Sequence, residues 1–151
     1  MDIFWLGNSS FRLKGKGANV LVNPEGVTVE ERLFSGPGEY ESKGVMIGGV
    51  NIGGSLAYWI GIDGLNIVYL STSQEIDKQK LEEMDEADIL LTPLASIVAD
   101  FEPKIIIPFS DDLDKLLKEL GVENPAPQPK LSITKDKLPE EPLVVSLDHA
   151  K

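Results

Sequence analysis

The first 70 residues consist mostly of short segments rich in apolar side chains and separated by Gly-rich turns. Residues 10–14 alternate between apolar and polar side chains, residues 3–6 form an apolar run, and strands are predicted over residues 3–6, 10–14, 19–22, 39–41, 45–47, 56–62 and 65–70. Asp63-Gly64 separates the last two segments and is a dipeptide that two-residue hairpin turns favour. The first half of the chain is therefore predicted to be rich in strands joined by tight turns.

Helical spacing appears only in the second half of the chain. Asp77 is a suitable N-cap for a first helix, whose buried stripe would contain Leu81 and Met84. A second helix is predicted to follow the capping residue Ser110, to carry leucines at positions 113, 116, 117 and 120 on one face, and to end before Gly121. Both helices are amphipathic, so each is expected to pack one face on the core.

Four short strands are predicted between and after these helices. Two are buried strands at residues 89–91 and 104–107, and a proline-rich connector of six residues at 124–129 precedes the other two, at 131–133 and 143–147. Two short strands after such a connector are too little for a second domain, so they are expected to return to the main sheet. The sequence predicts one α/β domain over residues 1–151, rich in strands and poor in helices.

The charge balance is strongly acidic. The 151 residues include 25 acidic and 14 basic side chains, a formal net charge of −11. Nucleic acids and anionic membrane surfaces bind clustered Lys and Arg, so neither is expected as a partner. No apolar run approaches the roughly 20 residues that span a bilayer, and residues 1–8 lack the pattern of a secretory signal. The cytoplasm is the expected location.

The chain has no cysteine and a single histidine, His149. Disulfides, thiolate nucleophiles and Cys-based metal sites are therefore excluded, and one chain cannot form a multi-histidine metal site. A Ser-His-Asp triad could use only His149, which is expected to lie without function in a mobile C-terminal tail.

Five segments carry a resemblance to a known family. They are Ile3-Phe4-Trp5-Leu6-Gly7-Asn8-Ser9-Ser10-Phe11-Arg12, Val20-Leu21-Val22-Asn23-Pro24, Gly36-Pro37-Gly38-Glu39-Tyr40-Glu41-Ser42-Lys43-Gly44-Val45, Asp63-Gly64-Leu65-Asn66-Ile67 and Glu102-Pro103-Lys104-Ile105-Ile106-Ile107-Pro108. Their sequence and order resemble the metallo-β-lactamase superfamily, in particular its small Zn-dependent hydrolase-like branch, related to the L-ascorbate-6-phosphate lactonase group. The resemblance implies a truncated αββα sandwich of the α+β type with few helices.

The same resemblance implies that the metal site has been lost. Family members hold one or two metal ions through histidines and aspartates, whereas the aligned positions here are Asn8, Asn23, Thr72 and Ser110. The family's histidine-rich loop and its following helix have no counterpart in residues 25–34. Neutral amides and hydroxyls cannot replace the imidazole and carboxylate ligands of a transition metal. These four degenerate active-site positions therefore imply no bound metal, no cofactor and no catalytic residue.

Two polar clusters have both a functional and a structural interpretation. Residues 110–114 contain a serine and three aspartates that could hold Ca²⁺ or Mg²⁺, but a capped helix with acids in its first turn is the favoured interpretation. Residues 8–10 could line a residual polar pocket, although such side chains more often bond to the backbone of a turn.

The leading functional hypothesis is a pseudoenzyme, a non-catalytic protein that acts as a binding, scaffolding or self-associating module. Because lost helices would leave apolar sheet surface uncovered, a homo-oligomer is expected; a subunit of a hetero-complex is a further possibility. The alternative is a metal-independent or residual hydrolase acting on a small ester, lactone or phosphoester through serine or aspartate groups. Its weakness is that no histidine is expected near serines such as Ser71 or Ser110 to act as a base.

Overall fold

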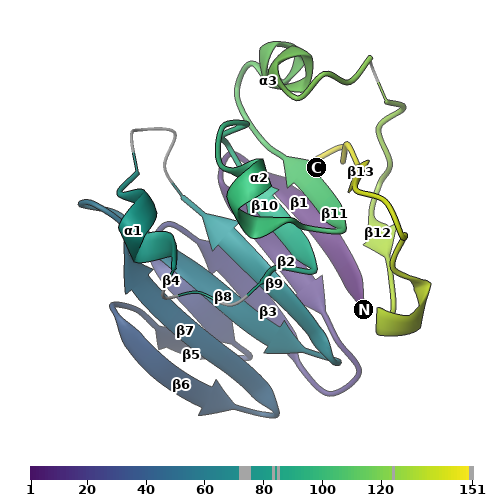
Figure 1. Ribbon diagram of the computed structural model, residues 1–151. Helices are drawn as coiled ribbons and strands as arrows, with labels where there is room; N and C mark the ends of the chain where they lie inside the picture. The colour runs from purple at the N-terminus through teal and green to yellow at the C-terminus, as the bar shows by residue number, and fades with distance from the viewer. Residues whose placement is uncertain (72–75, 83, 85, 124, 150–151) are drawn as a thin grey trace.

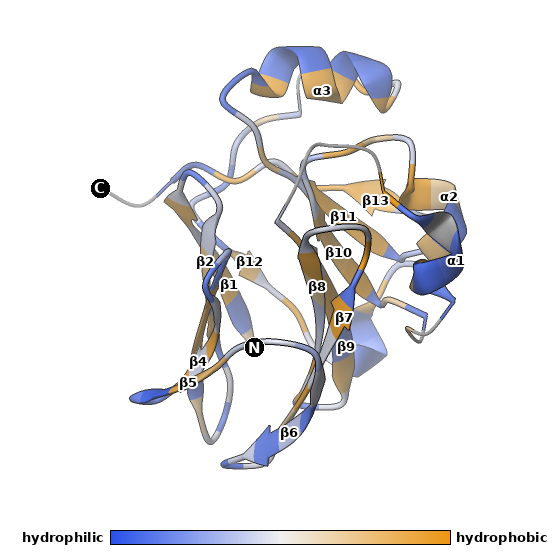
Figure 2. Ribbon diagram, turned by 90° about the vertical axis from the view of Figure 1, so that its left-hand side faces the viewer, coloured by the Kyte–Doolittle hydropathy of each residue, from blue (hydrophilic) through white to orange (hydrophobic). Residues whose placement is uncertain are grey.

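Two β-sheets packed face to face form the body of the protein (Figures 1 and 2). The computed structural model describes residues 1–71, 76–82, 84, 86–123 and 125–149. The chain builds most of the first sheet, crosses to the second, and then returns one short C-terminal strand to each. The last two strands were predicted to return to one main sheet; they do return, but one pairs with each of the two sheets.

The first sheet is antiparallel, with the strand order β12-β1-β2-β3-β4-β5. Its members are β1 (Asp2–Gly7), β2 (Ser10–Lys14), β3 (Asn19–Asn23), β4 (Gly26–Val29), β5 (Arg32–Phe34) and β12 (Leu131–Ser132). In β2, Phe11 and Leu13 are fully buried while Arg12 and Lys14 are exposed. The alternation along the sequence thus corresponds to one buried and one open face.

The second sheet is mixed, with the strand order β13-β11-β10-β9-β8-β7-β6. Its members are β6 (Gly38–Ser42), β7 (Val45–Asn51), β8 (Leu56–Ile62), β9 (Leu65–Leu70), β10 (Ile89–Thr92), β11 (Ile105–Pro108) and β13 (Leu143–Val144). Strands β9, β10, β11 and β13 run parallel, and β6 to β9 form antiparallel hairpins. The predicted turn between β8 and β9 is confirmed, with positive φ angles of 52° at Asp63 and 78° at Gly64.

The helices are short and lie in the second half of the chain. They are α1 (Lys78–Leu81), α2 (Val98–Phe101), α3 (Leu113–Glu119) and the 3-10 turn η1 (Lys135–Lys137). Helices α1 and α2 lie against the outer face of the second sheet, and α3 stands beyond the strand ends (Figure 2). Among the described residues, no helix is long and apolar enough to cross a membrane.

The two helix N-caps were predicted with different success. Asp77 caps α1 as predicted, because its carboxylate accepts the N–H of Gln79 at 3.1 Å. The prediction of Ser110 as the cap of α3 is wrong. Asp112 caps that helix by accepting the N–H of Lys115 at 3.2 Å.

Two apolar clusters hold the layers together. The larger fills the space between the sheets, and the smaller lies between the second sheet and helices α1 and α2, where Leu90, Ile97 and Phe101 are buried. The structure thus has the predicted two-sheet, strand-rich architecture with few helices. In its described part, helices cover the outer face of the second sheet alone.

Candidate functional site

Polar residues from both sheets meet at one edge of the sandwich. Because β9, β10 and β11 run parallel, their C-terminal ends share this edge. Ser71 follows β9, Pro93 follows β10 and Ser110 follows shortly after β11, while Asn8 and Ser9 form the turn between β1 and β2. The edge therefore collects short loops, the usual position of a ligand site in such sheets.

A cavity of about 310 Å³ opens at this edge and is called the strand-end cavity below. Its lining consists of Asn8, Ser9, Ser71, Pro93, Phe109, Ser110 and Asp111. An adjoining hollow of about 510 Å³ shares Asn8, Ser110 and Asp111 and is completed by Trp5, Leu6, Gly7, Leu113 and His149. The shared residues make the two spaces neighbours along one polar edge.

The turn that carries Asn8 is fixed by bonds to its backbone. Gly7 and Asn8 adopt positive φ angles of 94° and 51°. The indole N–H of Trp5 donates to the Asn8 carbonyl at 3.1 Å, and the Tyr69 hydroxyl donates to the Ser9 carbonyl at 2.6 Å. Since Tyr69 belongs to the second sheet, this bond ties the turn across the sandwich.

An aromatic floor lies beneath the strand-end cavity. The Phe109 ring stacks parallel to Tyr69 at 5.9 Å between centroids and meets Phe11 edge-on at 5.1 Å. Burial, and then the neighbouring Tyr58, raise the pKa of the Tyr69 phenol above its ordinary value. Tyr69 therefore stays protonated and serves as a hydrogen-bond donor to the turn.

The side chains at this edge are mainly neutral. Among the described residues that line the cavity or the adjoining hollow, Asp111 is the one carboxylate and His149 is the one imidazole. Asp111 lines both spaces, and His149 lines the adjoining hollow. The Ser71 hydroxyl donates to the Leu56 carbonyl at 3.2 Å, and the Ser110 hydroxyl accepts the N–H of Asp112 at 3.1 Å. No three His, Cys, Asp or Glu side chains gather into a metal-holding group within the described residues.

The four degenerate positions are only partly brought together. Asn8 and Ser110 line the same cavity. Asn23 is the last residue of β3 and lies at the same edge, but it does not line this cavity, and its side chain accepts the N–H of Glu25 at 2.9 Å. Thr72 lies outside the described residues.

The expected isolation of His149 is corrected by the structure. Its backbone pairs with Trp5 in a parallel bridge, and its ring meets the indole edge-on at 5.5 Å between centroids. It lines the same hollow as Ser110 and Asp111, so a histidine does lie near a candidate serine. This position depends on pairing between the two ends of the chain, for which the sequence contains no local signal.

Comparison with known proteins gives a structural likeness. No protein-family model matches the chain, and no curated protein matches it in sequence. A crystal structure from Thermotoga maritima, of a protein assigned as a Zn-dependent hydrolase of the metallo-β-lactamase superfamily, superposes with a TM-score of 0.78 and 20% identity. The match covers 97% of this chain and 98% of that one. The chain therefore has a metallo-β-lactamase-like fold.

Proposed function

We propose that the chain is a degenerate member of the small Zn-dependent hydrolase-like branch of the metallo-β-lactamase superfamily and acts as a non-catalytic binding or scaffolding protein. One observation carries the proposal: among the described residues, the polar side chains that line the strand-end cavity are one amide, three hydroxyls and one carboxylate, Asp111. Such groups can bind a small polar molecule through hydrogen bonds.

The zinc ion that the fold implies does not fit this set of donors. Zinc sites in proteins use three or four ligands drawn from imidazole, thiolate and carboxylate groups. The described lining offers one carboxylate, Asp111, and one imidazole, His149, on the adjoining hollow. No reaction step is therefore assigned to a metal in this protein.

The test is calorimetric titration of the purified chain with Zn²⁺ and Mn²⁺, beside a His149→Ala control. The expected result is weak zinc binding that disappears in the control, because a lone imidazole on an acidic surface binds zinc non-specifically. Tight binding of one zinc ion per chain that survives His149→Ala would overturn the proposal.

One observation favours a second candidate, a metal-independent hydrolase. Ser110, Asp111 and His149 line a common hollow, which supplies a nucleophile and a base of the required kinds. The discriminating assay is hydrolysis of p-nitrophenyl acetate in the presence of EDTA. We expect no turnover above background. Turnover lost in both Ser110→Ala and His149→Ala would replace the first proposal by this one.

A further inference from the structure

The outer face of the first sheet is open. The second sheet is covered by α1 and α2, whereas no helix of the described chain lies on the first sheet (Figure 2). A hollow of about 540 Å³ lies on it, lined by Phe4, Arg12, Lys14, Asn19, Val20, Leu21, Thr28 and Glu30. We call this surface the open sheet face.

An apolar row with a cation in it crosses the open sheet face. The register pairs Phe4 with Arg12, Arg12 with Leu21, Leu21 with Thr28, and Thr28 with Leu33. Phe4 and Leu21 are half-buried, and Leu33 is 52% exposed. Alternate strands lie about 10 Å apart, since neighbours are separated by about 4.8 Å. Phe4 and Leu21 thus flank Arg12 at a spacing close to the diameter of an α-helix.

The carboxylates of this face are already bonded. Asp2 accepts from the Ser132 hydroxyl at 2.7 Å and pairs with Lys130 at 3.3 Å. Glu30 accepts the N–H of Asn19 at 3.0 Å. Lys130 also lies over the Phe4 ring at 5.8 Å, so the three cations Arg12, Lys14 and Lys130 outnumber the carboxylates Asp2 and Glu30 among these residues.

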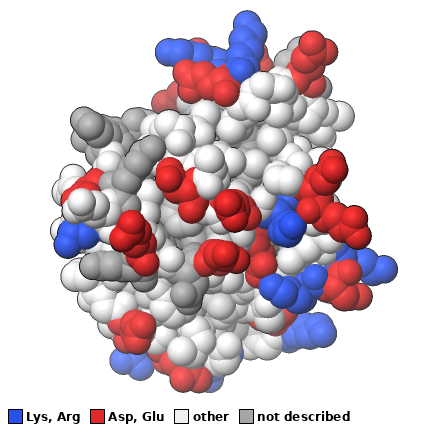
Figure 3. Space-filling view, viewed as in Figure 1, with Lys and Arg blue, Asp and Glu red and all other residues white. Residues whose placement is uncertain are grey.

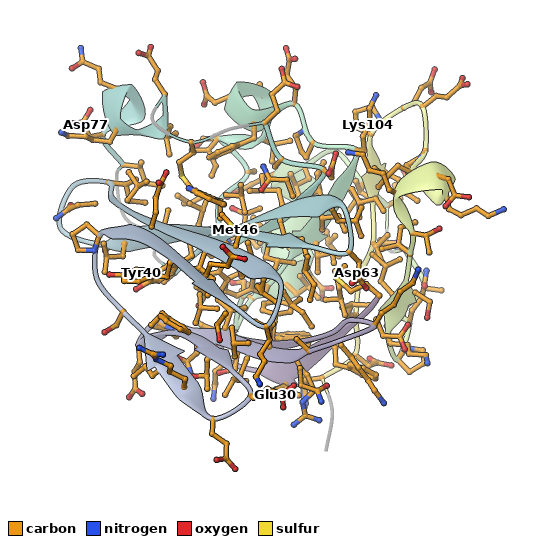
Figure 4. All side chains as sticks on the ribbon, turned by 90° about the horizontal axis from the view of Figure 1, so that it is seen from below. Glu30, Tyr40, Met46, Asp63, Asp77 and Lys104 are labelled. Atoms are coloured by element: carbon orange, nitrogen blue, oxygen red, sulfur yellow. The ribbon has the colours of Figure 1, made fainter. Side chains whose placement is uncertain are left out.

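Arg12 and Lys14 form neither an ion pair nor a side-chain hydrogen bond with any described residue. They stand out in a chain whose formal net charge is −11. Acidic side chains are spread over the side of the molecule that carries α1 and α2 (Figure 3). The open sheet face lies on the other side, since Figure 4 shows Glu30 of this face opposite Asp77, the cap of α1. Two unpaired cations set among apolar side chains are complementary to an acidic, amphipathic partner.

We propose that the open sheet face binds an acidic amphipathic helix of a partner protein. A sheet face presents side chains rather than free backbone groups, and a helix with an apolar stripe is a standard covering layer for it. A symmetric dimer through this face would bring the unpaired Arg12 and Lys14 of two copies into one interface. Contact between this face and the acidic side of another copy would be heterologous and would form rings or open chains rather than a two-fold dimer.

The proposed helix is a class of partner for the scaffolding role proposed above. It binds, however, at a different surface from the strand-end cavity. Metal binding at the cavity would overturn the proposed function and leave this inference intact. The probe is a fluorescein-labelled synthetic amphipathic helix of about 18 residues, or five turns, with Leu and Phe on one face and Glu on the other. A second peptide carries Lys at every Glu position.

Fluorescence anisotropy should detect the Glu peptide and not the Lys peptide. The double substitution Arg12→Glu with Lys14→Glu should weaken binding about tenfold or more, because it replaces attraction by repulsion. The charge-matched control, Lys115→Glu with Lys118→Glu on α3, should leave binding unchanged. Amide shifts in NMR spectra of the labelled protein should map to β1–β4, and circular dichroism should show that both variants are folded.

Three outcomes would overturn the proposal. They are no binding of the Glu peptide, equal effects of the two double variants, and amide shifts that map away from the first sheet. Light scattering measures the molar mass and so tests whether a second copy of the chain covers the open sheet face. A dimer that reverts to the 16.5 kDa chain in the Arg12→Glu, Lys14→Glu variant would assign the open sheet face to self-association instead.

Discussion

Tyr69 joins the second sheet to the turn that walls the strand-end cavity. Its buried hydroxyl donates to the Ser9 carbonyl at 2.6 Å. Tyr69→Phe should lower the free energy of unfolding by about 1–3 kcal/mol, because a shielded carbonyl loses its partner. Urea denaturation measures the change. Tyr40→Phe is the control, since its hydroxyl donates exposed bonds of 3.2 Å to the Ser35 and Pro37 carbonyls. Equal losses in the two variants would contradict a special role for Tyr69.

Asp2 provides a pH-dependent contact at the rim of the open sheet face. The hydrogen bond from Ser132, with a smaller contribution from Lys130, lowers the pKa of the Asp2 carboxyl. Because this pKa is depressed, the stabilisation is present above the ordinary aspartate pKa of about 3.9 and is lost as pH falls through the folded value. NMR titration should show a higher Asp2 pKa in Ser132→Ala.

Lys130→Met is a second variant for that titration. It should also raise the pKa of Asp2, because Lys130 both donates a hydrogen bond to the carboxylate and attracts its negative charge. A pKa that does not move in Ser132→Ala would contradict this account of the contact.

Residue-level features were predictable where their causes are local. The Asp63-Gly64 turn and the Asp77 cap depend on a few neighbouring residues, and both are confirmed. The choice between Ser110 and Asp112 as the cap of α3 was wrong because both types suit that role and lie two residues apart. The position of His149 beside Trp5 depends on contacts between the chain ends.

At the level of elements, the contact between β7 and β8 requires a glycine. Gly48 lies opposite Trp59, and a Cβ at Gly48 would overlap the indole ring. Gly48→Ala should therefore lower the free energy of unfolding by about 1–3 kcal/mol, the usual cost of overpacking. Gly61→Ala is the control, because its Cβ would meet Met46 at an ordinary 3.5 Å. Thermal unfolding should place the melting temperature of Gly48→Ala clearly below that of Gly61→Ala.

Most strands were predictable because they are short apolar or alternating segments bounded by turn residues, and in β2 the alternation in the sequence matches the alternation of burial. Strands β4 and β5 were missed, although Val27 and Val29 alternate with Thr28 and both valines are buried. Residues 26–34 form this hairpin where the family resemblance implies a histidine-rich loop and a helix. The first helix is shorter than its spacing predicted, because α1 ends at Leu81 while Met84 is buried beyond the helix end.

For the whole molecule, the candidate site was only partly predictable. The four degenerate positions rest on the family resemblance. Asn8 and Ser110 share a cavity because the β1–β2 turn of the first sheet meets the C-terminal ends of the parallel strands of the second. Asn23 ends β3 at the same edge without lining the cavity, and its side chain accepts the N–H of Glu25. The open sheet face could not be predicted from the sequence, because Phe4, Arg12 and Leu21 become neighbours only when the strands pair in this register.

The loss of the metal site is the central claim, and it is tested most directly by the metal content of the protein as it is produced. The chain should be purified without chelators or metal-affinity steps, beside a known zinc enzyme, and analysed by inductively coupled plasma mass spectrometry. We predict zinc, iron and manganese far below one ion per chain, with full occupancy in the control enzyme. One tightly held transition-metal ion per chain would contradict the claim.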